Sequence, residues 1–400
     1  MNLYMTLDVL PEGLQHETFI FEVIKDDEIL YSGNFKDKKE GETITILKDQ
    51  IITEDDSIYL VYIYIDGTRD NPGSMSNQKF KVTLYGEGTG AIYKENVIAQ
   101  PSTPSDSSSV FLNTSITRST IQTITIADTN TVPEDATYSE DISSEGDGSV
   151  MLWYTDDDGD GLLDVYMGSD NGVIITNTNG QGMFAYLENV ESLDLTNLDT
   201  SNITNMSSMF QGSSSLKEIK LSNFDISNVT SLSKMFHGCT SLIKLDLSNF
   251  DTTKVTNMAA MFQNCTNLKT IDLSSFDTSK VTTMTCMFYE CKSLENLDLS
   301  NFDTSNVTTV SYMFFRCTNL TQLDVNGFDT SKVTSMIFMF YECNSLIMLD
   351  TSNWDTSEVK KMSYMFFNCT NLTTLDVSGW NTGKVVDMQY MFSGVIVLEH

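Results

Sequence analysis

Four aspartates in the middle of the chain stand at spacings that could hold a metal ion. Asp156, Asp158, Asp160 and Asp164 form the pattern D-x-D-x-D-G-x-x-D, with Gly161 at a sharp turn. Carboxylate oxygens at alternating positions are the hard ligands that Ca²⁺ prefers. One hypothesis for these residues is therefore a calcium site.

The second hypothesis is that the same residues form the tip of a hairpin. The first six positions match an EF-hand-type loop, but the twelfth is Met167 instead of a bidentate Glu, and no helical pattern flanks the loop. The runs SVMLWYT and LLDVYMG on either side are typical of strands, between which Asp-Gly supplies turn chemistry and the acids face water. The sequence leaves both hypotheses open, so no cofactor is certain and calcium is the one candidate.

Another set of acids recurs at a constant interval along the chain, at a position that we expect to project from a strand. The candidate binding residues are Asp246, Asp272, Asp298, Asp324 and Asp350; Asp194 and Asp376 share their column, and Lys220 interrupts it. Like charges about 5 Å apart repel by about 1 kcal/mol even in water. A chain that tolerates such a column could use it to bind a basic partner or cations. The competing hypothesis is that these acids only keep an exposed sheet soluble.

Two further columns are expected to be structural. Aspartates from Asp199 to Asp355 precede Thr-Ser or a similar pair, and their side chains should cap turns by accepting backbone N–H groups. Six cysteines recur at 239, 265, 291, 317, 343 and 369, and we expect reduced, buried thiols, because no histidine column accompanies them as metal ligands. Ser213 stands in this column in the first unit, which suggests that only a small residue is needed. Cys286 lies outside the column and is expected near the surface.

Catalytic residues are scarce. The only histidines are His16, His237 and His400, and there is no nucleophile motif, phosphate-binding loop or metalloprotease helix. The sequence therefore predicts a protein that is not an enzyme.

The repeating columns require a repeating fold. The dipeptide Met-Phe occurs eight times with a period of 26, from Met209-Phe210 to Met391-Phe392, and a period of this length is typical of a solenoid. Within one unit, Leu297–Ser300 alternates apolar and polar residues like a strand, and 301–306 (NFDTSN) has turn composition. Apolar residues then follow three and four apart up to Cys317, which predicts one short helix or 3₁₀ turn per unit. The expected fold is an α/β leucine-rich-repeat solenoid with parallel strands.

The pattern LxxLDLSNFDTSNVTxMxxMFxxC closely resembles the BspA-like leucine-rich repeat in its 26-residue bacterial lipoprotein form, over roughly residues 187–396. The stretch 147–177 (DGSVMLWYTDDDGDGLLDVYMGSDNGVIITN) resembles the β-hairpin segment that leads into these repeats. The resemblance implies a bacterial cell-surface protein that adheres to host proteins or to neighbouring cells. Periodicity by itself indicates only a solenoid.

Charge limits the partners that the chain can bind. The formal net charge is -32, and residues 1–182 are the more acidic part, with 10 basic and 32 acidic residues against 13 and 23 in 183–400. Nucleic acids and anionic membrane surfaces require Lys/Arg patches, so neither is expected as a partner. No apolar run reaches the length of roughly 18 residues that a membrane span needs, so none is expected. The last residues, Leu398-Glu399-His400, look like the start of a vector-derived tag, so the missing export and anchor signals carry no weight.

The chain as a whole is expected to have several domains. Residues 1–98 contain six β-type runs separated by polar turns and are expected to form an all-β sandwich. Residues 99–109 (AQPSTPSDSSS) have linker composition. Residues 110–186 are expected to form a β-rich domain that caps the solenoid, since an open solenoid end must be covered. The solenoid itself is assigned to 187–397, in eight units, and 398–400 to the tag.

We therefore expect a non-catalytic extracellular bacterial protein that recognises host or neighbouring-cell proteins through its solenoid. The alternative is a structural spacer or stalk that presents the N-terminal domain.

Overall fold

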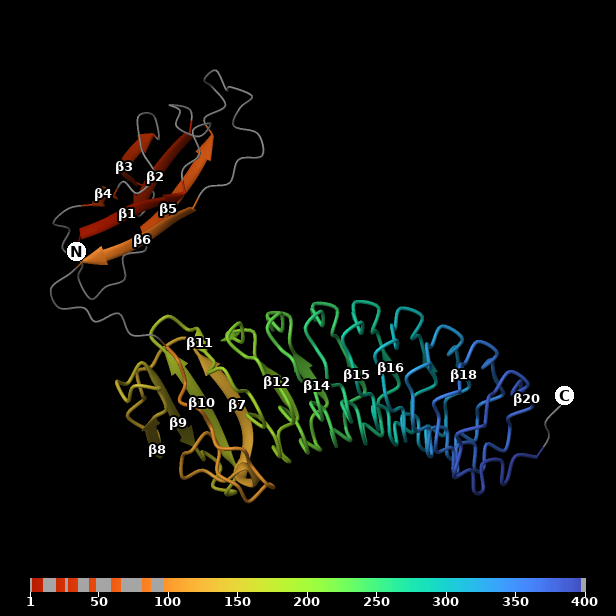
Figure 1. Cartoon of the computed structure of the whole chain (residues 1–400). Coiled ribbons are helices and arrows are strands. Elements are labelled where there is room, and N and C mark those ends of the chain that lie inside the picture. Colours follow the sequence, from red (N-terminus) through yellow and green to blue (C-terminus); the bar gives the residue numbers. More distant parts are fainter. Residues whose placement is uncertain are drawn as a thin grey trace. The chain divides into compact units, whose positions relative to one another are not determined.

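The computed structural model describes residues 2–9, 19–25, 28–34, 43–47, 59–65, 81–87 and 96–396, with side chains described from residue 96 onward. The chain divides into two compact units, Met1–Tyr93 and Lys94–His400 (Figure 1). The expected tag, 398–400, lies outside the described residues. Within the described part, no helix has the length and apolar character that a membrane span requires.

The first unit has strands in the six places where the sequence predicts them. They are β1 (Asn2–Val9), β2 (Phe19–Lys25), β3 (Glu28–Asn34), β4 (Thr43–Leu47), β5 (Tyr59–Ile65) and β6 (Lys81–Glu87). They form two antiparallel three-stranded sheets, in the orders β4-β1-β6 and β3-β2-β5. Packing of the two sheets into a sandwich stays a prediction.

The second unit opens with a four-stranded sheet. Its strands are β7 (Ile121–Ala127), β8 (Tyr138–Asp141), β9 (Val150–Thr155) and β10 (Leu163–Ser169), in the order β7-β10-β9-β8. β10 pairs parallel with β7 and antiparallel with β9, which in turn pairs antiparallel with β8. Strand β8 was not expected, because its sequence YSED alternates too weakly to be noticed. The run 110–116 (VFLNTSI), at the start of the segment expected to be β-rich, forms turns closed by one bridge between Val110 and Thr117.

The segment 99–109, whose composition suggested a linker, belongs to the second unit. Ala99 N donates to Ile142 O (2.8 Å), and Ser102 N donates to Asn113 Oδ1 (2.8 Å). Its polar side chains cap its own turns: Asp106 accepts from Ser108 N at 2.9 Å. Serine and proline mark turns as well as linkers, and the bonds to residues 113 and 142 decide between the two.

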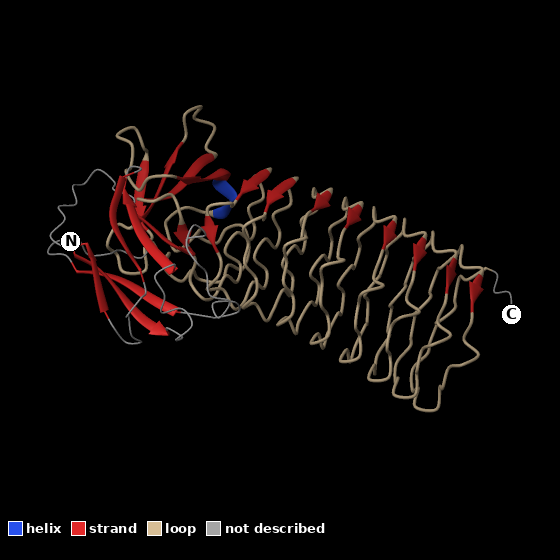
Figure 2. Ribbon diagram, turned by 90° about the horizontal axis from the view of Figure 1, so that it is seen from above, coloured by secondary structure: helices blue, strands red, loops and turns tan. Residues whose placement is uncertain are grey.

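The solenoid contributes one or two short strands to each of its coils, and Figure 2 shows a row of these strands along one long edge. They are β11 (Ile174–Ile175), β12 (Ser192–Asp194), β13 (Leu198–Asp199), β14 (Glu218–Lys220), β15 (Lys244–Leu245), β16 (Thr270–Ile271), β17 (Asn296–Leu297), β18 (Gln322–Leu323), β19 (Met348–Leu349) and β20 (Thr374–Leu375). All of their pairings are parallel, as predicted. Leu297 and Leu299 are buried, as their alternation with polar residues predicts.

The Met-Phe pairs line the interior of the solenoid. We name each coil after its Phe. From Phe210 to Phe366 every Met and Phe of the column is fully buried, and neighbouring rings stack with centroids 5.4–5.9 Å apart. Phe392, in the last described coil, is 37% exposed because no described coil covers it. This column therefore forms the interior of the solenoid.

The coils contain no helix, so the predicted helical turn and the α/β class are wrong for the described residues. In the Phe288 coil, Phe288 N donates to Met313 O of the next coil (2.9 Å), whereas Met287 N donates back to Met284 O (3.1 Å). An α-helix would keep all of these bonds inside one coil and leave the facing carbonyls of the next coil unsatisfied. Because the local bonds span three residues, apolar side chains three and four apart still reach the interior, which made the spacing look helical.

Each of these turns has two residues in the left-handed backbone region. In the Phe288 coil they are Cys286 (φ 59°) and Glu290 (φ 56°), and the same two positions repeat from coil to coil. Glycine fills the second position early in the solenoid, as Gly212 and Gly238. A non-glycine residue there costs on the order of 1 kcal/mol, which the bonds between coils must offset.

The solenoid also begins earlier than the sequence suggested. A ninth pair, Met183-Phe184, is fully buried, and the ring of Phe184 stacks on that of Phe210 at 5.9 Å. This pair lies one full period before Met209-Phe210, inside the segment that was assigned to the cap.

Arg118 closes the open end of this first coil. In later coils, carbonyls at the positions of Met183 and Ala185 accept N–H groups from the preceding coil, as Met209 O does from Phe184 N (2.9 Å). Here the Nη1 of Arg118 donates to Met183 O (3.0 Å) and to Ala185 O (2.8 Å). Arg118 is fully buried, and burial lowers the pKa of its guanidinium to about 10. One side chain thus replaces the N–H donors of a missing coil.

Candidate recognition surfaces

The five candidate aspartates of the strand face are exposed, but each also caps its own backbone. Oδ1 of Asp246 accepts the N–H of Ser248 at 3.0 Å, and Oδ1 of Asp298 accepts that of Ser300 at 2.9 Å. The same bond is made by Asp272, Asp324 and Asp350, at 2.9–3.0 Å. Capping was expected only of the other Asp column, so the strand column has a structural role that the sequence analysis did not assign to it.

These caps explain how the chain tolerates a column of like charges. Hydrogen bonds from the side chain and backbone of Ser248 hold the pKa of Asp246 below its usual range, and the neighbouring Asp272 carboxylate raises it by less. Donors from Ser274 and Ser352 lower the pKa values of Asp272 and Asp350 in the same way. Asp246, Asp272 and Asp350 therefore stay ionised on an exposed face.

The second Asp column caps turns, as predicted. Asp277 accepts from Ser279 N and Asp303 from Ser305 N, both at 2.9 Å. The threonine between each such Asp and Ser is buried and links neighbouring coils. Thr278, for example, donates from Oγ1 to Asp303 O at 2.9 Å. Asn381 makes the same cap in the Phe392 coil, accepting from Gly383 N at 3.0 Å. The cap therefore needs the oxygen of an Asp or Asn and does not need the charge.

The outward strand positions beside the candidate aspartates vary, and several hollows lie among them, two of which are lined by exposed apolar side chains. The first, of about 840 Å³, is lined by lysines 217, 220 and 244, by Ile243 and by Asp246. Two of these lysines are paired with acids of the preceding coil: Lys217 with Glu191 at 2.6 Å, and Lys220 with Asp194 at 2.7 Å. Lys220, which interrupts the acidic column, thus neutralises one of its members.

The second hollow, of about 480 Å³, lies toward the C-terminal end of the strand face. It is lined by Asp324, Asp350, Ile347 and Met348, among others. Ile347 is 51% exposed and Met348 is 57% exposed. Here the strand face therefore combines two exposed carboxyl groups with exposed apolar side chains.

The column cysteines are free, buried thiols, as predicted. Each donates to a Phe carbonyl of the preceding coil; Cys317 Sγ, for example, lies 3.1 Å from Phe288 O. Ser213 makes the corresponding bond to Phe184 O at 3.0 Å, so the column selects a small hydrogen-bond donor and not merely a small residue. Burial raises the pKa of Cys291 to about 12, and that of the half-buried Cys286 to about 11.

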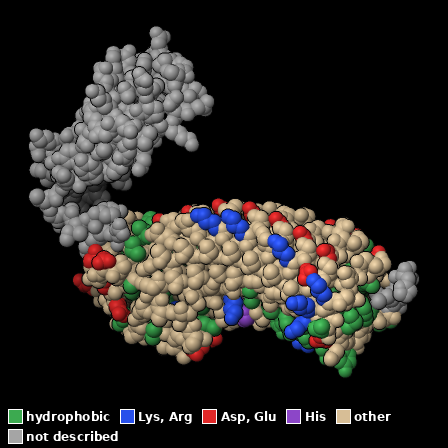
Figure 3. Space-filling view, viewed as in Figure 1, with side chains coloured by type: hydrophobic (Ala, Val, Ile, Leu, Met, Phe, Trp, Pro, Cys, Tyr) green, Lys and Arg blue, Asp and Glu red, His purple; other side chains and the backbone are tan. Residues whose placement is uncertain are grey.

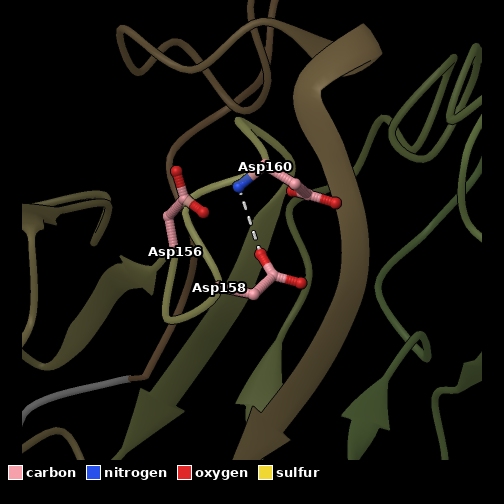
Figure 4. A group of neighbouring side chains, drawn as sticks. All are labelled: Asp156, Asp158 and Asp160. Carbon is pink, nitrogen blue, oxygen red and sulfur yellow. Dashed lines mark hydrogen bonds between the residues drawn. The ribbon is translucent and has the colours of Figure 1, made fainter.

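The central aspartates lie at the tip between β9 and β10 (Figure 4). Carboxylate oxygens of Asp156, Asp158 and Asp160 all come within 4.8 Å of one another, the one such group of acids, cysteines or histidines in the described part of the chain. Asp158 accepts from the backbone N of Asp160 at 3.2 Å, as Figure 4 shows. Asp164 is outside the group, because its Oδ1 accepts from Thr123 Oγ1 at 2.5 Å. A hairpin is present, and calcium binding by the other three stays a prediction.

One surface feature was missed by the sequence analysis. Eight rings, which we call the aromatic strip, lie on the turn side of the coils from Phe288 to Phe392: Tyr289, Tyr312, Phe315, Phe338, Tyr341, Tyr364, Phe367 and Tyr390. They form two columns with centroids 4.4–5.1 Å apart within a column. Rings of different columns are tilted by 43–57°. The signal was visible as aromatic residues repeating with the same period just outside the Met-Phe column.

The strip is only partly covered and ends abruptly. Most of its rings are half-buried, and Tyr390 is 58% exposed. In the Phe262 coil the same two positions hold Ala260 and Gln263. In Figure 3, hydrophobic side chains gather on the lower flank of the solenoid toward its C-terminal end.

Arg316 lies in the middle of the strip. Its guanidinium carbon is 5.3 Å from the centroid of the Phe315 ring. Nε donates to Glu342 at 2.8 Å and Nη1 to Glu290 at 3.3 Å, and each Glu belongs to an adjacent coil. The pKa of Arg316 is raised, first by the bond to Glu342. The charges beside the rings are therefore partly balanced within the strip itself.

Comparison with known proteins assigns the repeats to a family. The model of a family described as "Mycoplasma protein of unknown function, DUF285" matches residues 178–294, 266–350 and 323–400, so that the overlapping matches run from 178 to 400, more than half of the chain. No curated protein gives a significant match. A solved structure described as the crystal structure of a TLR13–ssRNA13 complex is 16% identical and covers 52% of this chain, which in turn spans 41% of that chain. The TM-score of this pair is 0.17, too low to carry an argument.

Proposed function

Because the chain belongs to the DUF285 family of repeat proteins, in which each unit repeats a common scaffold, we propose that it is a non-catalytic recognition module whose strand face binds another protein. We further propose that it is a BspA-like adhesin of a bacterial cell surface, which meets host or neighbouring-cell proteins outside the cell. The resemblance of its repeat to that of BspA-like surface proteins supports this finer proposal.

The observation that carries the binding proposal is the second hollow. A surface that is only kept soluble needs charge and does not need exposed apolar groups. Here Ile347 and Met348 are more than half exposed and line one hollow with Asp324 and Asp350. Exposed apolar side chains with a charged rim are the usual composition of a protein interface.

The chemistry of the strand face indicates the kind of partner. The caps fix the orientation of the aspartates, so their carboxyl groups form a regular acidic row about 4.8 Å apart. A partner with spaced lysine or arginine side chains and an apolar centre would complement this row. Such binding should be steered by charge and weaken with salt.

We propose that the protein is non-catalytic because its repeated polar side chains hydrogen-bond to the backbone and stabilise the coils. The buried thiols and threonines bond backbone carbonyls, as Cys317 and Thr278 do. Both Asp columns accept backbone N–H groups. These groups are thus committed to holding the coils together.

The test begins with a screen of purified extracellular-matrix proteins for binding to the full chain. The best binder is then measured against the triple variant Asp272→Asn, Asp298→Asn and Asp324→Asn. Asparagine retains the capping oxygen and removes the charge. If each exposed charge contributes about 0.5 kcal/mol, the affinity should fall about tenfold and become less dependent on salt.

The matched control is Asp277→Asn, Asp303→Asn and Asp329→Asn in the turn column. It changes the net charge equally and also retains the caps, since Asn381 occupies this column naturally. Equal losses in both variants would mean general attraction to an acidic chain and not a site. Unchanged affinity in the first variant, or no binder at all, would favour the alternative that the solenoid is a spacer presenting the N-terminal domain.

A further inference from the structure

The aromatic strip is a second surface, with chemistry unlike that of the strand face. Its rings stack face to face along each column, so their faces are covered by neighbours and their edges are left to the solvent. A sugar ring stacks on an open aromatic face, which this arrangement does not offer along the strip. Tyrosine edges and hydroxyls, in contrast, are typical of protein interfaces.

We propose that the aromatic strip is a self-association surface, on which a second copy of this chain docks in antiparallel orientation. The argument rests on charge order and on side-chain size along the strip. It is independent of the proposed function, because it uses a different face and a different partner.

Charge order makes the strip complementary to itself. Along the column beside the rings, successive coils carry Asn264, Glu290, Arg316, Glu342 and Asn368. A two-fold axis that crosses the strip midway between the Phe314 and Phe340 coils would set Arg316 of each copy opposite Glu342 of the other. Neither bond that Arg316 makes within its own chain uses Nη2, so that nitrogen can serve the second copy. An isologous interface requires such self-complementarity.

Side-chain size follows the same symmetry. The two-fold axis pairs the Phe288 coil with the Phe366 coil, and the Phe262 coil with the Phe392 coil. In the column of Tyr312, this sets Tyr364 opposite Cys286 and the exposed Tyr390 opposite Ala260. In this column, large side chains at one end of the strip thus meet small ones at the other end, as close packing of two surfaces needs. In the column of Phe315 the same axis sets Tyr289 opposite Phe367, so the complementarity of size is confined to the column of Tyr312.

The size of the strip sets the expected strength. Five coils at about 4.8 Å spacing give a strip about 20–25 Å long, which is at the low end for a specific interface. Repulsion between two chains of net charge -32 also opposes association. We therefore expect a dimer with a dissociation constant in the micromolar range, about 1–100 µM.

The experiment is sedimentation velocity on the full chain over about 1–100 µM, at 0.15 M and 0.5 M salt by the screening argument. The expected result is a monomer–dimer equilibrium that the higher salt does not weaken, because screening reduces the overall repulsion. The double variant Phe338→Ala and Tyr341→Gln gives the Phe340 coil the residues of the Phe262 coil at these positions, so the repeat tolerates it. It should weaken the dimer about tenfold or more.

The matched control removes apolar surface from the strand face. Ile347→Thr and Met348→Thr introduce the residues that stand at 373 and 374 in the next coil, and the dimer should persist. A charge exchange tests the orientation: Arg316→Glu alone should weaken the dimer, and adding Glu342→Arg should restore it, since opposite charges face each other again.

Three results would overturn the proposal. These are a chain that stays monomeric throughout, a dimer that the strip variant leaves intact, and a dimer that the strand-face control abolishes. Failure to restore association in the exchanged variant would overturn the antiparallel arrangement. A chain that stays monomeric, or a dimer that the strip variant leaves intact, does not bear on binding to matrix proteins, so the two proposals can fail separately.

Discussion

Phe314 and Phe315 are neighbours in the sequence and belong to different parts of the molecule. Phe314 is one ring in a fully buried column that runs through the described coils from Phe184 to Phe366. Phe315 belongs to the aromatic strip, which exists only from the Phe288 coil onward. What all coils share therefore holds the solenoid together, and what only some coils have is free to serve recognition. Each prediction below tests this division between inner and outer positions.

The largest loss of stability is expected from a substitution in the buried Phe column. Phe314→Ala should lower the free energy of unfolding by about 3–5 kcal/mol, because it removes a fully buried ring and leaves a cavity. Phe338→Ala in the aromatic strip should cost about 1–2 kcal/mol, since that ring is partly and not fully buried. Denaturant unfolding of both variants gives the comparison. Similar losses of unfolding free energy in the two variants would mean that the aromatic strip is part of the core, which would argue against a binding role for it.

Arg118 and Arg316 also differ as an inner and an outer position. Arg118 is fully buried and donates to two carbonyls of the first coil, so Arg118→Met should cost about 2–4 kcal/mol by leaving those carbonyls unsatisfied. Arg316→Met, on the surface, should cost about 1 kcal/mol or less. Hydrogen exchange should show the loss from Arg118→Met concentrated near residues 183–186. A uniform loss along the solenoid would contradict the end-capping role.

Replacing a column cysteine tests whether donor or size matters. Cys317→Ala removes the thiol that bonds Phe288 O and should cost about 1–2 kcal/mol, whereas Cys317→Ser should cost less, because Ser213 serves this position naturally. An alanine variant as stable as the serine variant would show that only size matters. Alkylation of the native protein should modify at most Cys286, and slowly, since burial raises its pKa to about 11; all seven thiols should react after denaturation.

A smaller effect is expected at the turn caps. Asp329→Ala should cost about 0.5–1 kcal/mol, and Asp329→Asn less, because the amide oxygen still accepts the N–H of Ser331. The bond from Ser331 lowers the pKa of Asp329. Its contribution is therefore present above the unfolded pKa of about 3.9 and is lost as pH falls through the lower folded value. Acid unfolding of the Asn variant should lack this component.

The smallest of the expected effects is the heat of calcium binding. If Asp156, Asp158 and Asp160 bind Ca²⁺, calorimetry on the full chain should show one weak site that Asp158→Asn removes, in the millimolar range typical of extracellular modules. Asp164→Asn is the control, because Asp164 lies outside the group and bonds Thr123. The absence of heat at millimolar Ca²⁺ would leave the hairpin tip as the whole explanation of these residues.

Much of the fold could be predicted because the residues that face inward recur at the same positions in every repeat. Leu297, Leu299, Phe314 and Cys317 recur at fixed offsets, and a side chain that recurs in every coil must face the same way in every coil. The inner columns, the parallel strands and the buried thiols followed from that. Met183-Phe184 carried the same signal and was overlooked, because the columns around it change at the start of the solenoid.

Only the tertiary structure decided what depends on residues far apart in the chain. Spacings of three and four residues suit a helix or a chain of tight turns equally well, and the bond from Phe288 N to Met313 O, in the next coil, selects the turns. Arg118 reaches Met183 across 65 positions, and no local pattern indicates that contact. The aromatic strip likewise becomes one surface only when coils stack. The sequence by itself thus determined which side chains face inward, because that is fixed within each repeat. The stacking of coils decided how the backbone is satisfied and what the outer surface offers, because those bonds and contacts exist only between repeats.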